Sequence, residues 1–216
     1  MLAVAHAVAG WPGAVTLVPA FSTLALAIIS LGGLWLCLWR GRWRYGGLLA
    51  VGLGIVLAGQ GDPPDILIDG RGKIMAARLE NRAVLVAAPY RRKSITLSTW
   101  LRRWGRKEPS KDDSIMRCDG LGCALIHGGN AVGFARGPAA LEDDCRVADL
   151  VLSAVPVRFN CPSAKMVIDR FDLWRRGAIA VRWRDGVIKV EGANDSRGDR
   201  PWSRPRARRR NKKPVD

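Results

Sequence analysis

The amino-terminal part of the chain alternates long apolar runs with very short polar ones. No charged residue occurs between Met1 and Trp39. Val15–Trp39 is a run of 25 uncharged residues, and a helix of that length exceeds the hydrocarbon core of a bilayer, which is roughly 30 Å thick. Tyr45–Gly61 is a second uncharged run of 17 residues, at the lower limit for spanning. The pattern predicts two transmembrane helices, with a re-entrant segment as the alternative for the second.

Small residues recur every fourth position in the second run. A stripe of this kind allows helix backbones to approach closely in lipid, where apolar surface alone does not drive association. A general richness in Gly and Ala is the alternative, but the regular spacing favours a packing face. We therefore expect neighbouring transmembrane helices, including helices from outside this chain. The helix-packing stripe consists of Gly46, Ala50, Gly54 and Ala58.

The loop between the two runs predicts the orientation of the hairpin. It carries Arg40, Arg42 and Arg44 within five residues, and short arginine-rich loops are retained on the cytoplasmic side. Both flanks of the hairpin then face outward. We expect a multi-pass protein of the inner (cytoplasmic) membrane whose domain from Asp62 onward lies on the extracytoplasmic side.

After Gly61 the pattern changes to short apolar or alternating runs separated by turn residues, which is typical of strands, with a few runs at helical spacing. Strands and helices in this mixed order predict an α+β (or α/β) fold with a small mixed-sheet domain. The predicted strands are Ile66–Ile68, Lys73–Leu79, Ala83–Ala88, Ala124–His127, Ala131–Ala135, Leu150–Ser153, Met166–Asp169, Ala178–Arg184 and Val187–Glu191. The predicted helices are Thr96–Gly105, Pro138–Cys145 and a helix capped by Asp169 and stopped by Gly177.

Charge divides the chain into three regions. The 216 residues carry a formal net charge of +16, and the chain ends in "RPWSRPRARRRNKKPVD", which is too charged and too rich in proline to bury a core. The predicted organisation is a transmembrane helical hairpin at 1–61, an extracytoplasmic domain at 62–192 and a disordered basic tail at 193–216.

Four cysteines follow the hairpin. In an oxidising compartment an even number of cysteines in a small domain is most simply interpreted as two disulfides, although four cysteines allow three connectivities. A zinc site is the alternative, because Cys118, Cys123 and His127 have a C-x4-C-x3-H spacing. We favour disulfides, since an exported thiol site is exposed to oxidation. The disulfide candidates are Cys118, Cys123, Cys145 and Cys161; Cys37 lies apart, in the first apolar run.

Residues typical of an active site are scarce. The chain has two histidines, His6 and His127, which cannot form the clusters of a catalytic metal pair. Neither a G-x-S-x-G motif nor a phosphate-binding glycine loop is present. The acidic stretch "LEDDC", with Glu142, Asp143 and Asp144, is typical of a solvated helix face. The sequence thus predicts a protein that is not an enzyme, with no catalytic residue, no metal, no cofactor and no evident small-molecule substrate.

Several segments in this order resemble one known family. They are "AGWPGAVTLVPAFSTLALAIISLGGLWLCLWRGRWRYGGLL", "PPDILIDGRGKIMAARLENRAVLV", "STWLRRWG", "RCDGLGC", "LEDDCRVADLVLSAVP" and "VIDRFDLWRRGAIAVRWRDGVIKVEG". Together they resemble the carboxy-terminal part of the ComEC family of competence proteins, in the α-proteobacterial form. The resemblance implies an inner-membrane channel for single-stranded DNA uptake, with an extracytoplasmic domain similar to metallo-β-lactamases.

The resemblance also indicates what this chain lacks. "ADLVLS" is similar to a strand that leads into a histidine-bearing loop in many members, but Ala154, Val155 and Pro156 follow it here, and the H-x-H-x-D-H signature is missing. The resemblance therefore implies a degenerate metallo-β-lactamase-like domain. Met1 falls within what resembles the last helices of the channel, so we expect a truncated or split product.

The leading hypothesis is a ComEC-like component of DNA uptake that contacts membrane lipid, other transmembrane helices of a competence channel and single-stranded DNA. The alternatives are a non-functional remnant, a membrane-anchored basic binding protein and, less favoured, a metal-dependent nuclease using His127 and the cysteines. A solvated basic face is the alternative for the DNA-contacting residues. These candidates are Arg91, Arg92, Lys93, Arg102, Arg103, Arg106 and Lys107.

Overall fold

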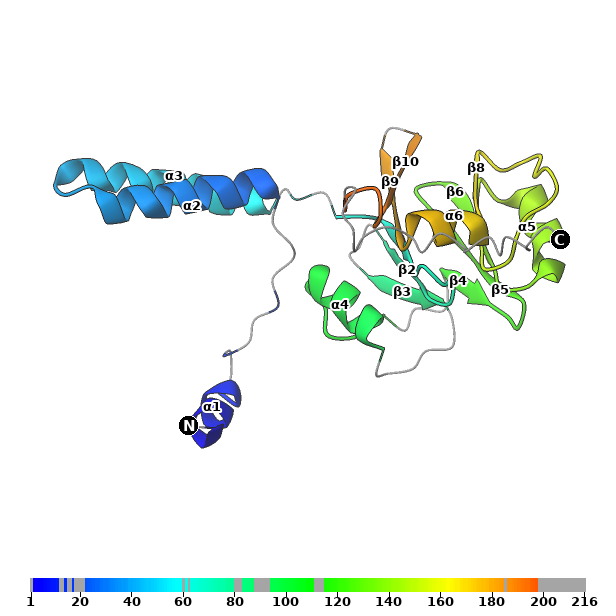
Figure 1. Cartoon of the computed structure of the whole chain (residues 1–216), viewed down its shortest axis with the longest axis horizontal. Coiled ribbons are helices and arrows are strands. Elements are labelled where there is room, and N and C mark those ends of the chain that lie inside the picture. Colours follow the sequence, from blue (N-terminus) through cyan, green and yellow to red (C-terminus); the bar gives the residue numbers. More distant parts are fainter. Residues whose placement is uncertain are drawn as a thin grey trace, which may run out of the picture. The chain divides into compact units, whose positions relative to one another are not determined.

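The structure is a computed structural model that describes residues 2–11, 14, 17, 22–59, 61, 63–79, 83–87, 94–110, 115–184 and 186–197. It divides into two units, one of Met1–Pro63 with Ile95–Glu108 and one of Pro64–Ser94 with Pro109–Asp216. Among the described residues there are six α-helices and two five-stranded sheets (Figure 1), so the fold class is α+β.

The two apolar runs form an α-helical hairpin. Helix α2 spans Thr23–Leu38, the turn η1 spans Arg42–Arg44, and α3 spans Tyr45–Ala58. Helix α2 begins late because Ser22 caps it, accepting a hydrogen bond from Ala25 N at 3.2 Å. The first predicted helix is therefore 16 residues long instead of 25, and most of its predicted first turns lie outside the described residues. In the described part of the chain, no helix is both long and apolar enough to cross a membrane.

Two further helices belong to the same unit. Helix α1, Leu2–Ala9, was not predicted, whereas α4, Ile95–Arg103, matches the helix expected from the spacing of its apolar residues. Leu97 and Leu101 in α4 are buried, and Arg102 and Arg103 are exposed in its last turn.

The first sheet of the other unit is antiparallel throughout. Its strands have the order β10-β9-β1-β2-β3, and each pair of neighbours is antiparallel. The amino- and carboxy-terminal parts of the unit therefore share one sheet. The strands are β1 (Ile66–Ile68), β2 (Met75–Arg78), β3 (Val84–Ala87), β9 (Ile179–Arg184) and β10 (Val187–Gly192).

The second sheet is mixed, with the order β4-β5-β6-β7-β8. Its first two pairings are antiparallel and its last two are parallel. Helix α5, Pro138–Val147, connects the parallel strands β6 and β7, and α6, Arg170–Arg176, follows β8. The domain expected to hold one small mixed sheet has two sheets. The strands are β4 (Met116–Cys118), β5 (Gly122–His127), β6 (Asn130–Ala135), β7 (Leu150–Ser153) and β8 (Met166–Ile168).

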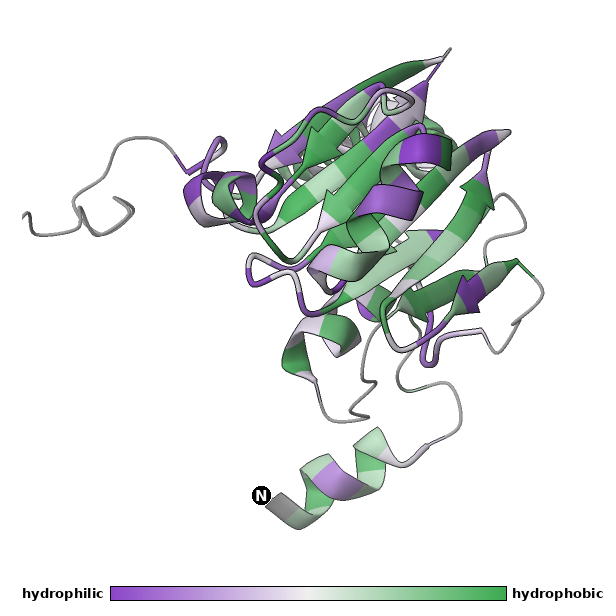
Figure 2. Cartoon of the chain, turned by 90° about the vertical axis from the view of Figure 1, so that its right-hand side faces the viewer, coloured by the Kyte–Doolittle hydropathy of each residue, from purple (hydrophilic) through white to green (hydrophobic). Residues whose placement is uncertain are grey.

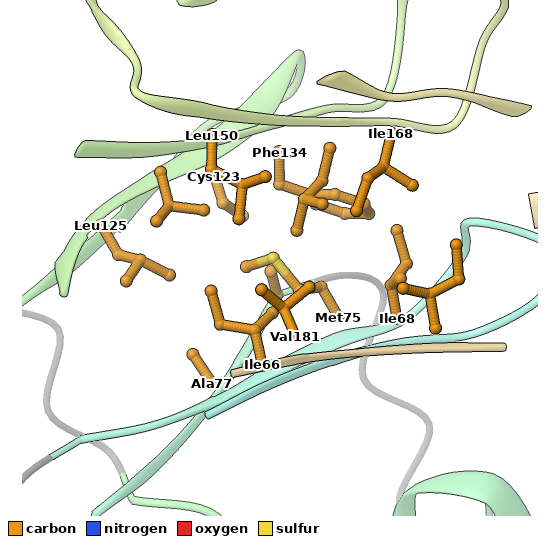
Figure 3. Packing of buried hydrophobic residues seen from close by; sticks show 14 of the residues in the cluster. Ile66, Ile68, Met75, Ala77, Cys123, Leu125, Phe134, Leu150, Ile168 and Val181 are labelled. Carbon is orange, nitrogen blue, oxygen red and sulfur yellow. The ribbon is translucent and has the colours of Figure 1, made fainter. Parts of the chain in front are cut away.

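The two sheets pack face to face around one hydrophobic core. Figure 3 shows Ile66, Met75 and Val181 of the first sheet pointing toward Phe134 and Leu150 of the second. These positions alternate along their strands, as expected when one face of each strand is buried. In Figure 2, apolar positions dominate the inner strands of the two sheets, and many hydrophilic positions lie in the loops and on the helices beside the sheets.

The second sheet is also covered on its outer face. Leu141 and Cys145 of α5 pack with Val151 of β7 in a second buried cluster. At Gly133 a Cβ atom would lie 2.8 Å from Asp144 Cγ, so only glycine allows α5 to lie this close to β6. Strand β7 is thus buried on both faces, which fits its nearly unbroken apolar sequence.

The carboxy-terminal boundary of this domain lies later than predicted. Residues 193–197 form turns, and Asp195 binds Arg176 through an ion pair of 2.6 Å. The hydrogen bond from the Arg176 side chain, together with the one from Gly192 N, lowers the pKa of Asp195. The basic tail predicted from residue 193 therefore begins with five residues attached to α6 and β10; residues 198–216 lie outside the described residues.

Candidate functional site

The hairpin is held together by small residues on both helices. A Cβ atom at Gly54 would lie 2.5 Å from Ile29 Cγ1, and one at Gly47 would lie 2.6 Å from the carbonyl oxygen of Gly32. At Gly32 itself a Cβ would lie 2.9 Å from Ala50 Cβ. Small residues at a helix–helix contact allow the backbones to approach this closely, as is common in membrane helices.

Part of the predicted stripe lies at the contact between the two helices, and the helix that packs against it is α2 of the same chain. Ala50 and Gly54 face α2, but Gly46 is exposed, with Trp35 Nε1 as the nearest atom to a Cβ there at 3.8 Å. Gly47 takes the place in the seam that the fourfold spacing assigned to Gly46, and Ala58 is half-buried. We expected helices from outside the chain on this face, and α2 occupies it instead.

The rest of the hairpin surface is apolar. Neither helix contains a charged residue, and ten large aliphatic side chains are each more than half exposed. An apolar surface formed by so many large side chains is rare on soluble monomers and marks contact with protein or lipid. The ten residues are Leu24, Leu26, Leu31, Leu34, Leu38, Leu48, Leu49, Leu53, Ile55 and Val56.

The turn between the helices combines aromatic and basic side chains. Trp35 stacks on Trp39, with ring centroids 5.0 Å apart, and its Nε1 donates to the carbonyl oxygen of Trp43 at 3.0 Å. Trp39 and Trp43 are exposed, as are Arg40, Arg42 and Arg44. Amphipathic rings beside arginines are typical of the boundary between lipid and water.

The four cysteines of the two-sheet domain form two disulfides. Cys118 and Cys123 are bonded, facing each other in the register of β4 and β5, with their Cα atoms 4.0 Å apart. Asp119 shapes the intervening turn by accepting hydrogen bonds from Leu121 N and Gly122 N. These backbone bonds lower the pKa of Asp119. The prediction of disulfides is confirmed, and the zinc alternative is wrong because two of its three ligands are bonded to each other.

The second disulfide joins Cys145 of α5 to Cys161 in the segment before β8, with a Cα separation of 4.6 Å. Both residues belong to the buried cluster on the outer face of the second sheet. This bridge fixes the long connection between the parallel strands β7 and β8. Cys37 of α2 is a free, exposed cysteine.

The end of β7, where the resemblance implies a catalytic loop, is filled by backbone-bonding and apolar groups. Ser153 is fully buried, and its hydroxyl donates to the carbonyl oxygen of Val155 at 2.7 Å. Ala154 lies against Gly72: a Cβ atom added to Gly72 would be 3.0 Å from the Cα atom of Ala154. Asp169 accepts from Phe171 N, Asp172 N and Val157 N. Its oxygens cap α6, and no three His, Cys, Asp or Glu side chains gather as a metal site in the described residues.

The acidic stretch on α5 is only partly solvated. Glu142 and Asp143 are exposed, as predicted for a solvated face, but Asp144 turns toward β6. Its Oδ2 is buried and lacks a hydrogen-bond partner among the described residues. Burial, with smaller contributions from the charges of Asp119 and Asp143, raises the pKa of Asp144 to about 6. The fold therefore holds the Asp144 carboxyl group where its ionised form is disfavoured.

The candidate DNA-contacting residues fall in two groups. Arg102, Arg103, Arg106 and Lys107 are exposed at the end of α4 and just after it. The segment with Arg91, Arg92 and Lys93 lies outside the described residues. Four of the seven basic residues are thus close in sequence on one exposed helix end.

A further polar cluster was missed by the sequence analysis. Asp65 is 4% exposed and accepts hydrogen bonds from Trp183 N at 2.7 Å and Arg184 Nη1 at 2.9 Å. With Arg78 and His127 it lines a cavity of about 350 Å³. An aspartate directly before an apolar strand was the one visible signal, but its partners lie 118 and 119 positions away.

No family model, curated protein or solved structure matches this chain.

Proposed function

We propose that this chain is a membrane-anchored, non-catalytic component of single-stranded DNA uptake, similar to ComEC competence proteins. The observation that carries the proposal is the pair of face-to-face sheets with helices α5 and α6 beside them (Figure 1). Such a sandwich is what the resemblance implies for the extracytoplasmic domain of this family. In this proposal the domain is a degenerate metallo-β-lactamase-like fold, in which Ala154, Val155 and Pro156 follow β7 where many family members have a histidine-bearing loop.

The α2–α3 hairpin is the membrane anchor in this proposal. A helix that is apolar on all sides needs lipid or protein around it, and the hairpin exposes aliphatic side chains of both helices. A helix of 16 residues rises roughly 24 Å, less than the hydrocarbon core of about 30 Å. Local thinning of the bilayer, or packing against the helices of a separate channel subunit, accommodates such a mismatch.

The disulfides support an extracytoplasmic position for the two-sheet domain. Disulfides persist in the periplasm and are rare in the cytosol, and this domain contains two. Arg40, Arg42 and Arg44 at the turn of the hairpin favour a cytoplasmic position for that turn. The disulfides and the arginine-rich turn thus support the same proposed orientation in the inner membrane.

In this proposal the exposed arginines at the end of α4 bind the phosphates of single-stranded DNA. Binding that neutralises phosphates releases counterions, so affinity falls steeply as salt rises. The test measures binding of the full chain in detergent micelles to an oligodeoxynucleotide over a salt series. Arg102→Glu with Arg103→Glu is expected to weaken binding and flatten the salt dependence.

The matched control reverses two exposed charges elsewhere, Arg170→Glu with Arg175→Glu on α6. This control is expected to retain most of the affinity and the slope. Equal losses in both double variants would show that DNA is attracted only by the net charge of +16. Binding that is insensitive to salt would contradict the proposal.

A further inference from the structure

A polar pocket lies at the end of the two-sheet domain where strands β1, β2, β5, β6, β9 and β10 begin or end. Its volume is about 350 Å³, within the usual range for small ligands. The pocket lies at the β5–β6 turn, where β6 begins. Because β6 and β7 are parallel, Ser153 at the end of β7 lies at the opposite end of the sheet. The pocket is therefore distinct from the place where the resemblance implies catalysis. Its lining residues are Asp65, Arg78, Leu79, His127, Gly128, Asn130, Trp183, Arg184 and Gly186.

Asp65 organises the basic side chains of this pocket. Its carboxylate accepts from Arg184 Nη1 at 2.9 Å and lies 4.0 Å from Arg78 Nη2. The Asp65 side chain is 6% exposed, whereas that of Arg78 is 26% and that of Arg184 is 44% exposed. The buried carboxylate thus orients two guanidinium groups that still reach the surface.

Two buried donor atoms of this cluster have no acceptor among the described residues. Among the described charged residues that line the pocket, one carboxylate faces two guanidinium groups. Arg78 Nε and Trp183 Nε1 are both buried without a hydrogen-bond partner in the described residues. Each of these nitrogen atoms can only donate, and buried donors in folded proteins nearly always have an acceptor. Among the described residues, the cluster therefore offers no acceptor to Arg78 Nε or Trp183 Nε1.

The wall and rim of the pocket leave room for such an acceptor. His127 lies beside Trp183, with ring centroids 6.2 Å apart, and adds a further side chain that can donate. Gly128 and Gly186 form hairpin turns with φ of 55° and 76°, and a Cβ at either would meet nothing within 4 Å. The rim consequently carries no side chain at Gly128 or at Gly186.

We propose that this pocket binds a phosphate group, held by the guanidinium groups of Arg78 and Arg184 beside the imidazole of His127. A planar guanidinium matches a tetrahedral phosphate through two parallel N–H donors, and preorientation by Asp65 reduces the entropy lost on binding. The same chemistry is offered by free inorganic phosphate and by the phosphodiester of a nucleic acid strand. The inference does not depend on the proposed function, because inorganic phosphate is the first probe.

Nuclear magnetic resonance of the histidine side chains tests this proposal in the full chain. The sequence holds two histidines, so His127 can be followed with His6 as an internal reference. Titration with inorganic phosphate at constant ionic strength is expected to shift the His127 resonances to saturation and to leave those of His6 unchanged. A dispersed amide spectrum confirms folding in each sample.

Substitution of the arginines separates a built site from general attraction of anions. Arg184→Gln is expected to weaken phosphate binding about tenfold or more, as the loss of one charge-assisted hydrogen bond predicts. Arg184→Lys, which retains the charge without the planar fork, is expected to weaken it less. The matched control is Arg182→Gln on the same strand, because Arg182 pairs with Glu191 and does not line the pocket.

Two results would overturn the proposal: a His127 resonance that does not move at millimolar phosphate, or equal weakening by Arg182→Gln and Arg184→Gln. The source of the phosphate is resolved by a second titration. A single-stranded oligodeoxynucleotide is compared with one whose linkages are uncharged methylphosphonates. A response to the charged strand alone identifies nucleic acid, and a response to inorganic phosphate alone identifies a small anion.

Discussion

The carboxylate of Asp65 accepts a hydrogen bond of 2.7 Å from the backbone N–H of Trp183, 118 residues further along the chain. The bond joins the residue before β1 to β9, two neighbouring strands of the first sheet that lie far apart in sequence. Because Asp65 also accepts from Arg184, a single buried side chain supports both the sheet and the charged pocket.

Replacement of Asp65 by alanine is expected to destabilise the domain by about 1 to 3 kcal/mol, because it leaves the buried backbone N–H of Trp183 without its acceptor. Urea unfolding followed by circular dichroism measures the change in the free energy of unfolding. Asp143→Ala, at an exposed position on α5, is the control and is expected to change stability by less than about 0.5 kcal/mol. Similar stability of the two variants would show that the Asp65 cluster does not hold the sheet.

Replacement of Gly54 by leucine is expected to separate the two helices of the hairpin. The new side chain would collide with Ile29 and with the backbone of α2, and helices in lipid depend on such close contacts. Spin labels on α2 and α3 measure the distance in micelles. Gly52→Leu is the matched control, since a Cβ there meets nothing within 4 Å; an equal distance change in both variants would contradict the packing seam.

Loss of the Cys145–Cys161 bridge is expected to cost about 3 kcal/mol on the chain-entropy estimate for a loop of this length, against about 2 kcal/mol for Cys118–Cys123. The bonded cysteines are 16 residues apart in the Cys145–Cys161 bridge and 5 residues apart in the Cys118–Cys123 bridge. Thermal unfolding of the paired serine variants measures the difference. A larger loss for the short loop would mean that strain or local packing, and not loop length, determines the contribution.

Replacement of Asp144 by asparagine is expected to stabilise the domain at neutral pH. The pKa of Asp144 is raised to about 6 by burial, so the folded state binds a proton more tightly than the unfolded state. Stability therefore decreases as pH rises from about 4 to about 6 and stays lowered above that range.

The gain from Asp144→Asn at about pH 7.5 is expected to be near 1 kcal/mol, discounted for partial exposure. Unfolding curves at that pH and at about pH 4 measure it, and most of the gain is expected to be lost at the lower pH, where the folded state keeps its proton and the unfolded carboxyl is only about half ionised. Asp143→Asn, at an exposed position, is the control. A gain that is independent of pH would show that charge on Asp144 is not its cause.

Local patterns in the sequence were sufficient for most elements of the two-sheet domain. β1 and β7 match their predicted bounds because each is a short apolar run between turn residues, and α6 follows from the Asp169 cap and the Gly177 stop. β4 was missed because Met116–Cys118 shows no alternation and has one buried residue. It is a strand because β5 pairs with it.

Tertiary relationships could not be predicted in the same way. The pairing of Cys118 with Cys123 and of Cys145 with Cys161 is one of three connectivities that the spacing allows, and the register of β4 with β5 selects it. The partners of Asp65 come from the other end of the chain. The late start of α2 depends on the Ser22 cap, which a hydropathy pattern does not reveal.

The most direct test of the central claim, a membrane-anchored domain outside the cytoplasm, is non-reducing peptide mass spectrometry of the chain isolated from membranes. The account predicts recovery in the membrane fraction with intact Cys118–Cys123 and Cys145–Cys161 bridges and a free thiol at Cys37. Free thiols at all five cysteines, or recovery of the chain outside the membrane fraction, would contradict it.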